Sequence, residues 1–391
     1  MDQGRKTIIS SEYLSEKGKS CCRIIPKFST AVCCIGSIGK CGYLNVEGTT
    51  NQQINSVIPN IDSLYAYYYC SSDYFLEQLL SLASATTIAI VNKSKMESVL
   101  IPVPPMVEQQ RIANTLDTAL GLIETLEVEK SDIIVSINNV KSKILDLAIR
   151  GKLVPQDSND EPASVLLERI REEKEKMIEQ GKIKRDKKES VIFKGDDNSY
   201  YLRTDKLIES LDDWHFDELP YNWSLCCFGE ICDYGNCINV DSSSIAESAW
   251  ILDLEDIEKD TGIVLKKIKK SERNAASKKH LFHKGQVLYS KLRPYLNKVV
   301  LADEDGYCTS EILPLDFSEI IVPEYARYFL MSPTFLRYAN KCSYGVKMPR
   351  LGTTDGKKAI LSLPPIEEQK RIVIAIEKAF SSLSSITENL S

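Results

Sequence analysis

The sequence predicts an α+β protein in which two similar domains are joined by a long antiparallel pair of coiled-coil helices. Three observations lead to this prediction: a repeat displaced by 260 residues, a heptad spacing of apolar residues after each copy, and short strand and helix patterns within each copy. The chain has 391 residues, of which 43% are hydrophobic and 27% are charged, so it is long enough to bury more than one core.

The repeat is clearest in a proline-led motif. The pattern Pro-Pro-x-x-Glu-Gln-x-Arg-Ile occupies residues 104–112 and recurs at 364–372. The same displacement aligns Tyr65, Ala66, Tyr68, Phe75 and Leu76 with Tyr325, Ala326, Tyr328, Phe335 and Leu336. The lysine-flanked segments 27–40 and 284–298 also match, at a slightly shorter displacement. Agreement of this extent indicates a tandem duplication.

The repeat also predicts where each copy begins and ends. The second copy opens near Glu218, so the first would open about forty residues before Met1, and we expect the first domain to be truncated at its N-terminus. Ser391 matches a position inside the first copy's helix, so the second helix is expected to be short. The expected parts are a first domain at 1–103, a long heptad helix at 104–150, a helix and charged connector at 151–219, a second domain at 220–363 and a second heptad helix at 364–391.

Apolar residues at heptad spacing follow each copy of the proline-led motif. In the first copy, Pro105 is typical of a helix start and Gly151 of a helix end, so one helix would cover 106–149 and extend about 66 Å. Because the two apolar stripes match, we expect the two helices to pair antiparallel. The alternative is that each amphipathic helix packs on its own domain.

Shorter patterns describe the rest of the chain. Strands are predicted at 23–25, 30–35 and 285–289, and helices at 63–83 and 323–341 that are interrupted near Ser71 and Ser332. After the long helix, a charged helix is expected with Asp160 as its N-cap, Pro162 in its first turn and Gly181 after its end. The basic tract 182–188 and the polar run to residue 199 are expected to form a solvated connector or a strap that docks a partner.

The charge of the chain is unevenly distributed. The formal net charge of -6 argues mildly against nucleic-acid binding. Residues 261–300, the basic window, nevertheless hold eleven basic residues against the single acid Glu272, with Tyr289 and Tyr295 among them. Because basic side chains neutralise phosphates and arginine can bind guanine through two hydrogen bonds, we expect a DNA face; a solvated basic surface is the alternative. The DNA-binding candidates are Lys40, Lys291, Arg293, Tyr295, Lys298, Lys347 and Arg350.

The sequence has no complete catalytic or metal-binding pattern. Residues 36–40 end like a phosphate loop, but Cys34 and Cys41 stand where that loop needs glycine and serine or threonine, so a glycine hairpin is expected. His280 and His283 could share a helix face but have no third ligand. The cysteines at 21–22, 33–34, 226–227, 232 and 237 lack zinc-site spacing and are expected to be small buried hydrophobic residues. We therefore predict a chain that is not an enzyme and needs no metal or cofactor.

The compartment follows from the absence of two signals. No run approaches the roughly 18 to 20 consecutive apolar residues of a membrane helix, and the first residues lack the apolar core of a secretory signal. We expect a cytoplasmic protein with no membrane partner, whose twelve cysteines are reduced.

The double motif, together with GKLVPQDSNDEPASVLLERI and TNQQINSVIP, resembles the specificity subunit of type I restriction-modification systems. The resemblance implies two target-recognition domains that each bind half of a split sequence in double-stranded DNA. It also implies two adenine-N6 methyltransferase subunits and a restriction subunit as partners that perform the catalysis. Carried over by position, the platform for the methyltransferase subunits would include Glu108, Gln109, Arg111, Glu368, Gln369 and Arg371. The alternatives are a partial or donor allele without full activity, and a coiled-coil scaffold that binds proteins.

Overall fold

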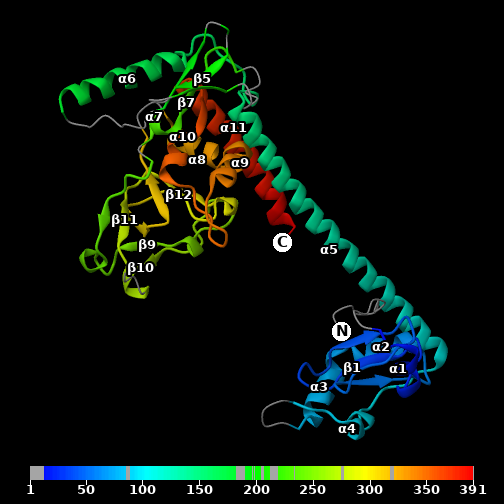
Figure 1. Cartoon of the computed structure of the whole chain (residues 1–391). Coiled ribbons are helices and arrows are strands. Elements are labelled where there is room, and N and C mark those ends of the chain that lie inside the picture. Colours follow the sequence, from blue (N-terminus) through cyan, green and yellow to red (C-terminus); the bar gives the residue numbers. More distant parts are fainter. Residues whose placement is uncertain are drawn as a thin grey trace. The chain divides into compact units, whose positions relative to one another are not determined.

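The computed structural model describes residues 13–84, 89–181, 190–195, 197, 199–203, 207–211, 219–232, 234–273, 277–317 and 321–390. It divides into two compact units (Figure 1), which we call unit 1 (Met1–Ser131) and unit 2 (Asp132–Ser391). The boundary falls inside helix α5 (Met106–Ile149), so this helix contributes to both units.

Unit 1 is built around a three-stranded antiparallel sheet. Strand β1 (Thr30–Cys33) lies between β2 (Cys41–Tyr43) and β3 (Ile54–Val57), and all four residues of β1 are buried. The helices are α1 (Glu16–Cys21), α2 (Ser63–Cys70), α3 (Asp73–Leu82), α4 (Lys93–Glu97) and the first part of α5. Side chains of β1 and α3 share one hydrophobic cluster, in which Val32 and Leu79 are fully buried.

Unit 2 contains a sheet of the same form, in which β12 (Val287–Ser290) lies between β13 (Val299–Leu301) and β15 (Ile312–Leu315). A five-stranded sheet has the order β10 (Ile268–Lys269), β9 (Trp250–Leu252), β14 (Gly306–Thr309), β11 (Lys279–Phe282) and β8 (Asn239–Val240). Strand β7 (Ser224–Cys227) pairs with β16 (Ile360–Leu363), while β4 (Val191–Lys194), β5 (Tyr200–Arg203) and β6 (Ile208–Ser210) form a small sheet.

The helices of unit 2 cover these sheets and connect them. They are the last part of α5, α6 (Ala163–Glu179), α7 (Phe228–Ile231), α8 (Pro323–Met331), α9 (Pro333–Cys342), α10 (Thr353–Lys358) and α11 (Ile366–Asn389). Short 3-10 turns lie at Ser242–Ser244, Leu254–Asp256, Lys270–Glu272 and Pro294–Leu296. None of the helices in the described ranges is long and apolar enough to cross a membrane.

The tandem duplication predicted from the sequence is visible in the strand register. In unit 1, Thr30 of β1 faces Tyr43 on one neighbour and Val57 on the other. In unit 2, Val287 of β12 faces Leu301 and Leu315 in the same way. The two three-stranded sheets therefore have the same order, direction and pairing.

The predicted helix interruptions are confirmed at the same place in both units. The Ser72 hydroxyl accepts a hydrogen bond from Phe75 N at 3.3 Å and caps α3, and the Ser332 hydroxyl accepts from Phe335 N at 3.3 Å and caps α9. A serine that binds the backbone three residues ahead starts a new helix and ends the previous one. The interruption is therefore built into the repeated sequence.

Several smaller predictions can now be compared with the structure. The glycine hairpin is confirmed: β1 and β2 pair across it, with Gly36 and Gly39 at φ of 78° and 86°. The strand at 23–25 is wrong, because only a single bridge joins Ile25 to Gly48. His280 and His283 do not share a helix face, since His280 lies on β11 with its Nδ1 2.8 Å from Ile312 O, and burial lowers the pKa of His280.

The cysteine prediction is confirmed at most positions and wrong at one pair. Cys33, Cys34, Cys226, Cys227 and Cys232 are buried, Cys237 is half-buried, and none of these six forms a disulfide. Cys21 and Cys22 are exposed. Across the described ranges, the structure contains no group of three or more His, Cys, Asp or Glu residues that could hold a metal ion.

Helix α5 has the predicted length and the predicted end. It runs for 44 residues, and Gly151 follows it with φ of +66°. A Cβ atom at Gly151 would lie 2.4 Å from Pro220 Cγ, so both the backbone conformation and the packing require glycine there.

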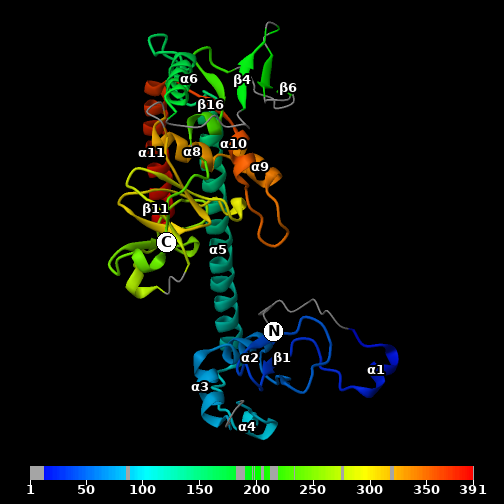
Figure 2. The same ribbon diagram turned by 60° about the vertical axis from the view of Figure 1, so that its left-hand side comes forward.

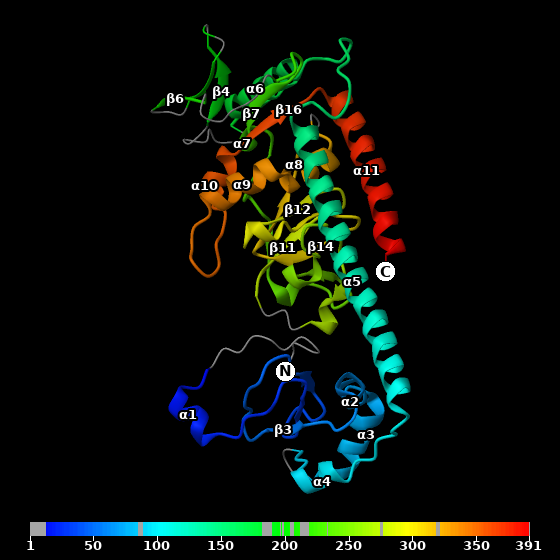
Figure 3. The ribbon, with the colours of Figure 1, turned by 90° about the vertical axis from the view of Figure 1, so that its right-hand side faces the viewer.

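Within unit 2, the last part of α5 lies antiparallel to α11, as predicted (Figure 3). Leu145 and Ile149 of α5 share a hydrophobic cluster with Ile372 and Ile376 of α11, and Lys141 Nζ lies 5.6 Å from the centre of the Phe380 ring. The contact does not follow the strict heptad: of the predicted stripe, the side chains at 137 and 144 are covered, but those at 133 and 140 are exposed. A straight helix of 3.6 residues per turn rotates away from a seven-residue repeat, which explains this drift.

The segment after α5 differs most from the prediction. The N-cap of α6 is Pro162, and the Asp160 carboxylate binds Arg371 instead. The basic tract 182–188 lies outside the described residues. The expected solvated connector is wrong for strand β4, because Ile192 packs into a buried cluster with Leu202 of β5 and with side chains of β7 and β16.

The paired part of α5 gives a first prediction. Replacing Leu145, which is 5% exposed, with alanine leaves a cavity between the helices and should lower the free energy of unfolding of unit 2 by about 2 to 5 kcal/mol. Leu126→Ala is the matched control on the same helix, because Leu126 is 63% exposed and its loss should change stability by less than about 0.5 kcal/mol. Denaturant unfolding measures the free energy of unfolding of both variants. A loss for Leu145→Ala as small as that for Leu126→Ala would show that the Leu145 side chain does not pack between the helices.

Candidate nucleic-acid interface

Acids from other parts of unit 2 neutralise much of the basic window. Lys267 Nζ lies 2.7 Å from Asp303 and 2.9 Å from Glu304. Arg273, with a side chain only 10% exposed, binds Asp256 at 2.7 Å. Further pairs are Lys270 with Glu247, Lys278 with Asp241 and Lys279 with Asp253. The window is therefore not one continuous basic face, because acids that are remote in sequence fold against it.

Two loops that carry predicted DNA contacts are joined through their backbones. Arg293 N donates to Pro349 O at 2.7 Å, and Leu351 N donates to Lys291 O at 3.0 Å. Tyr344 and Arg350 bridge across the second loop, which we call the 344–350 hairpin. The fold thus brings together candidates that are more than fifty residues apart in sequence.

Arg350 stabilises this junction rather than presenting a free guanidinium. Its Nε and Nη2 atoms donate to the Glu311 carboxylate at 2.8 to 3.1 Å. The hydrogen bond from Arg350 holds the pKa of Glu311 below its ordinary value, so this pair persists at neutral pH and is lost only in acid. Because two of its nitrogens are engaged by Glu311, Arg350 does not present a free guanidinium to a guanine.

Two other residues of the predicted face are also directed into unit 2. Lys298 Nζ donates to Leu254 O at 2.6 Å, and burial lowers the pKa of this lysine. The Tyr289 side chain is buried in the core. Neither fits the expected role in DNA binding, because its polar group is satisfied or enclosed within the fold.

The remaining candidates keep accessible side chains. Lys347 and Tyr295 are exposed, and Lys291 and Arg293 are half-buried. Arg293 has a left-handed backbone with φ of 50°, and its Nε atom is buried without a hydrogen-bond partner in the described part of the chain. In unit 1, Lys40 is exposed at the turn between β1 and β2.

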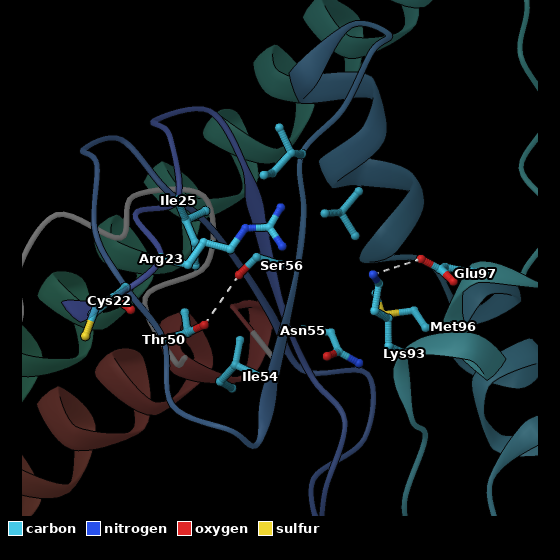
Figure 4. A pocket seen from close by; sticks show the side chains of 13 residues that line it. Cys22, Arg23, Ile25, Thr50, Ile54, Asn55, Ser56, Lys93, Met96 and Glu97 are labelled. Atoms are coloured by element: carbon cyan, nitrogen blue, oxygen red, sulfur yellow. Dashed lines mark hydrogen bonds and ion pairs between the residues drawn. The ribbon is translucent and has the colours of Figure 1, made fainter. Parts of the chain in front are cut away.

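Unit 1 also contains a hollow of about 700 Å³ between β3 and α4 (Figure 4). Arg23, Asn55 and Lys93 line it, and Lys93 Nζ lies 3.5 Å from Glu97. In unit 2, Thr353 occupies the position that matches Lys93, and a Cβ atom at Gly235 would lie 2.9 Å from it. Among the described residues, the hollow contains no group of His, Cys, Asp and Glu side chains that could hold a metal ion.

The glutamine of the proline-led motif ties each long helix to its unit. Gln109 Oε1 accepts from Asp62 N at 2.9 Å, and its Nε2 donates to Pro104 O at 2.7 Å. Gln369 repeats this arrangement with Val322 N at 2.9 Å and Pro364 O at 3.0 Å. Every partner is displaced by 260 residues, so the motif is a structural joint that occurs twice.

The glutamate and arginine of the motif differ between the two copies. Glu368 is fully buried and accepts from Trp223 Nε1 at 2.9 Å and from Gln156 Nε2 at 2.6 Å, and burial raises its pKa. Arg371 binds the buried Asp160 carboxylate at 2.6 and 3.2 Å. In unit 1, the corresponding Glu108 and Arg111 form only an exposed pair at 3.8 Å.

This geometry corrects the predicted platform for partner subunits. Gln109, Glu368 and Gln369 are at most 2% exposed, so they stabilise the chain and cannot form a docking surface. Arg371 is engaged with Asp160. Glu108 and Arg111 remain accessible.

The comparisons with known proteins agree with the repeat. A family model for the type I restriction modification DNA specificity domain matches residues 2–139 and 221–391. The chain belongs to this family. The two matched regions correspond to the two copies of the repeat, each with a helix that begins at the glutamine joint.

Individual members of the specificity family are more distant. The chain is 23% identical to the EcoDI specificity subunit of Escherichia coli over 81% of its own length and 62% of that protein. It is 30% identical to the EcoAI specificity subunit of the same organism over 65% of its length and 40% of that protein. The chain thus spans less than two thirds of these relatives. A chain from a solved structure of a type I R-M system shares the fold, with a TM-score of 0.57 and 14% sequence identity. The match covers 94% of this chain and 78% of that chain.

Sequence reasoning missed contacts made by residues that the specificity-family match also leaves out. Gln156 and Asp160, which bind Glu368 and Arg371, lie between the two matched regions. The sequence GKLVPQDSNDEP, which contains both residues, contributed to the family resemblance. Its spacing does not indicate which residues of the proline-led motif Gln156 and Asp160 bind. Glu311, which binds Arg350, had no sequence signal because the repeat does not preserve this pair.

The glutamine joint gives a second prediction. Gln109→Ala removes both hydrogen bonds and leaves a backbone N–H and a carbonyl unsatisfied, so it should lower the free energy of unfolding of unit 1 by about 1 to 3 kcal/mol. Gln110→Ala is the matched control, since Gln110 is the next residue on α5 and is exposed. Thermal unfolding compares the two, and a control as destabilised as Gln109→Ala would refute the joint.

The difference between the two copies gives a third prediction. Arg371→Ala leaves the Asp160 carboxylate uncompensated and should cost about 1.5 to 3 kcal/mol of stability. Arg111→Ala, at the matching position in unit 1, removes only an exposed pair and should cost less than about 1 kcal/mol. Chemical denaturation of both variants tests the ranking, and the reverse order would contradict it.

Proposed function

We propose that this chain is the DNA-recognition subunit of a type I restriction-modification complex and binds a bipartite target in double-stranded DNA. The observation that carries the proposal is the duplicated unit, with the same sheet register and the same glutamine joint at the start of a long helix. Two units that share one fold but differ in their surface residues can bind a DNA target that consists of two different half-sites. Membership of the specificity family supports this assignment.

The two target-recognition domains are proposed within residues 1–103 and 220–363. Lys40, Lys291, Arg293, Tyr295 and Lys347 are the proposed DNA contacts that agree with the exposure of their side chains. The lysines would neutralise phosphates, whereas an arginine or a hairpin side chain can contact base edges. Lys298 and Arg350 are no longer proposed for these roles.

The chain is proposed to be non-catalytic, with methylation and cleavage performed by two adenine-N6 methyltransferase subunits and a restriction subunit. The surface proposed for the methyltransferase subunits is the face of α5 that carries Glu108 and Arg111 and continues through Leu116, Ile123 and Leu126. These three apolar side chains are 38%, 51% and 63% exposed. An exposed apolar stripe on a helix suits packing against helices of a partner.

The test of the function is a methylation map. We expect the chain, co-expressed with the methyltransferase subunit from its own operon, to direct adenine methylation to one split sequence across the host genome. A complex that forms but methylates no defined sequence would contradict the DNA-recognition role and favour the protein-interaction scaffold. A map with one specified half-site would contradict the proposal of two working domains.

A fourth prediction concerns the electrostatics of DNA binding. Affinity of the wild-type chain for duplex DNA should fall steeply with added salt, with a log–log slope of about 0.9 for each phosphate that is neutralised. Lys291→Ala should weaken binding to all sequences alike and reduce the slope by about 1, whereas Lys378→Ala, an exposed lysine on α11, should leave both unchanged. Fluorescence anisotropy at several salt concentrations measures the slope. A slope near zero for the wild-type chain would exclude phosphate contacts.

A further inference from the structure

The tip of the 344–350 hairpin holds apolar side chains out in solvent. Tyr344 is 62% exposed, Val346 is 100% exposed and Met348 is 50% exposed. Lys347, which lies between Val346 and Met348, is also exposed. The hairpin connects α9 to α10 and extends away from the sheets of unit 2 (Figure 2). Exposed apolar side chains on a projecting loop mark a contact surface rather than a part of the core.

The base of the hairpin is held firmly, unlike a loose surface loop. Tyr344 N donates to Arg350 O at 3.1 Å, and Arg350 N donates back to Tyr344 O at 2.9 Å. The pair between Arg350 and Glu311 and the bond from Arg293 N to Pro349 O attach the same residues to the neighbouring loop. Gly345 has φ of +99°, a conformation that permits the tight turn. The tip is therefore presented in a defined direction.

Unit 1 contains the same frame with a different tip sequence. Ser84 N donates to Ile90 O at 3.1 Å, and Ile90 N donates to Ser84 O at 3.2 Å, at positions displaced by 260 residues from Tyr344 and Arg350. Ile90 also bridges to Ile35, as Arg350 bridges to Leu292. The residues between the bridge partners are Ala-Thr-Thr-Ile-Ala in the first copy and Gly-Val-Lys-Met-Pro in the second, with no identity at any position.

The two copies share the backbone hydrogen bonds of the hairpin but differ in every residue between the bonded positions. This pattern is expected where the residues at the tip determine which ligand is bound. We propose that residues 345–348 of the hairpin contact base edges in the major groove and determine one half-site of the DNA target. The inference rests on the proposed function and deepens it, because it assigns sequence discrimination to one element of unit 2.

The chemistry of the tip fits the major groove. This groove is wide enough to admit a two-stranded β-ribbon, and it displays thymine methyl groups and the O6 and N7 acceptors of guanine. Val346 and Met348 offer apolar contacts for a methyl group, and the Lys347 ammonium can donate to the guanine acceptors. Glu311 at the base of the hairpin is paired with Arg350, which neutralises its charge and limits repulsion of the phosphates.

The test is selection of duplexes from a random library by the full-length chain, followed by sequencing. The tip variants are Val346→Ala, Met348→Ala and Lys347→Ala, and Lys378→Ala on α11 is the matched lysine control. We expect each tip variant to retain total DNA at low salt within about two-fold of wild type, because phosphate contacts dominate that affinity. Discrimination should fall by about 10-fold at adjacent positions of one half-site only, as is typical of a lost base contact. The control should select the wild-type sequence.

The outcomes separate this inference from the function on which it rests. If the wild-type chain retains no duplex and selects no sequence, the proposed function fails, and the hairpin assignment fails with it. If the wild-type chain selects a split sequence and all three tip variants select the same one with equal discrimination, only the hairpin assignment is overturned. Tip variants that select DNA normally but no longer co-purify with the methyltransferase subunit would also overturn it, and would make the hairpin a protein contact.

Discussion

The architecture depends on one buried glutamine side chain that occurs twice. Gln109 and Gln369 each accept a hydrogen bond from the backbone that starts the preceding helix pair and donate one to the proline carbonyl at the start of the long helix. Because both bonds are buried, breaking either leaves an unpaired polar group, which is costly. The direction in which each long helix leaves its sheet is thereby fixed by a short sequence motif. This joint explains why a glutamine lies within the most clearly repeated segment of the chain.

The charged residues divide into those that build the frame and those that are presented to a ligand. Arg350, Arg371 and Arg273 each bind carboxylates within unit 2, so their charges stabilise the fold. Lys347 projects into solvent from the hairpin that the pair between Arg350 and Glu311 helps to hold. A count of basic residues along the sequence cannot make this division, because paired and unpaired arginines have the same formal charge. The division matters for function, since only unpaired cations can release counterions from DNA.

The two units share a frame but use it differently. In unit 2, the start of α11 is covered by the segment after α5, through Gln156 and Asp160, and by Trp223. At the start of α5 in unit 1, the corresponding motif residues Glu108 and Arg111 are accessible. The same nine-residue motif is therefore a buried junction in one copy and an accessible surface in the other. Identity of sequence fixes the helix joint, while the environment decides what the remaining motif residues contact.

The sequence by itself determined the elements whose signals are local or repeated. The displacement of 260 residues identified the duplication, and serines at 72 and 332 marked the helix interruptions. The heptad spacing indicated α5, and Pro105 and Gly151 marked its ends. These features depend on backbone conformation and on periodicity, which a linear sequence records directly. They also sufficed to suggest the family.

Only the tertiary structure decided which side chains are available. The acids that neutralise the basic window lie up to about 37 residues away, Glu311 lies 39 residues from Arg350, and Asp160 lies 211 residues from Arg371. The strands at 191–210 were likewise missed, because their burial comes from β7 and β16 rather than from their own pattern. The shared hairpin frame of 84–90 and 344–350 consists of backbone hydrogen bonds, which any residue can make. A comparison of side chains therefore could not detect it.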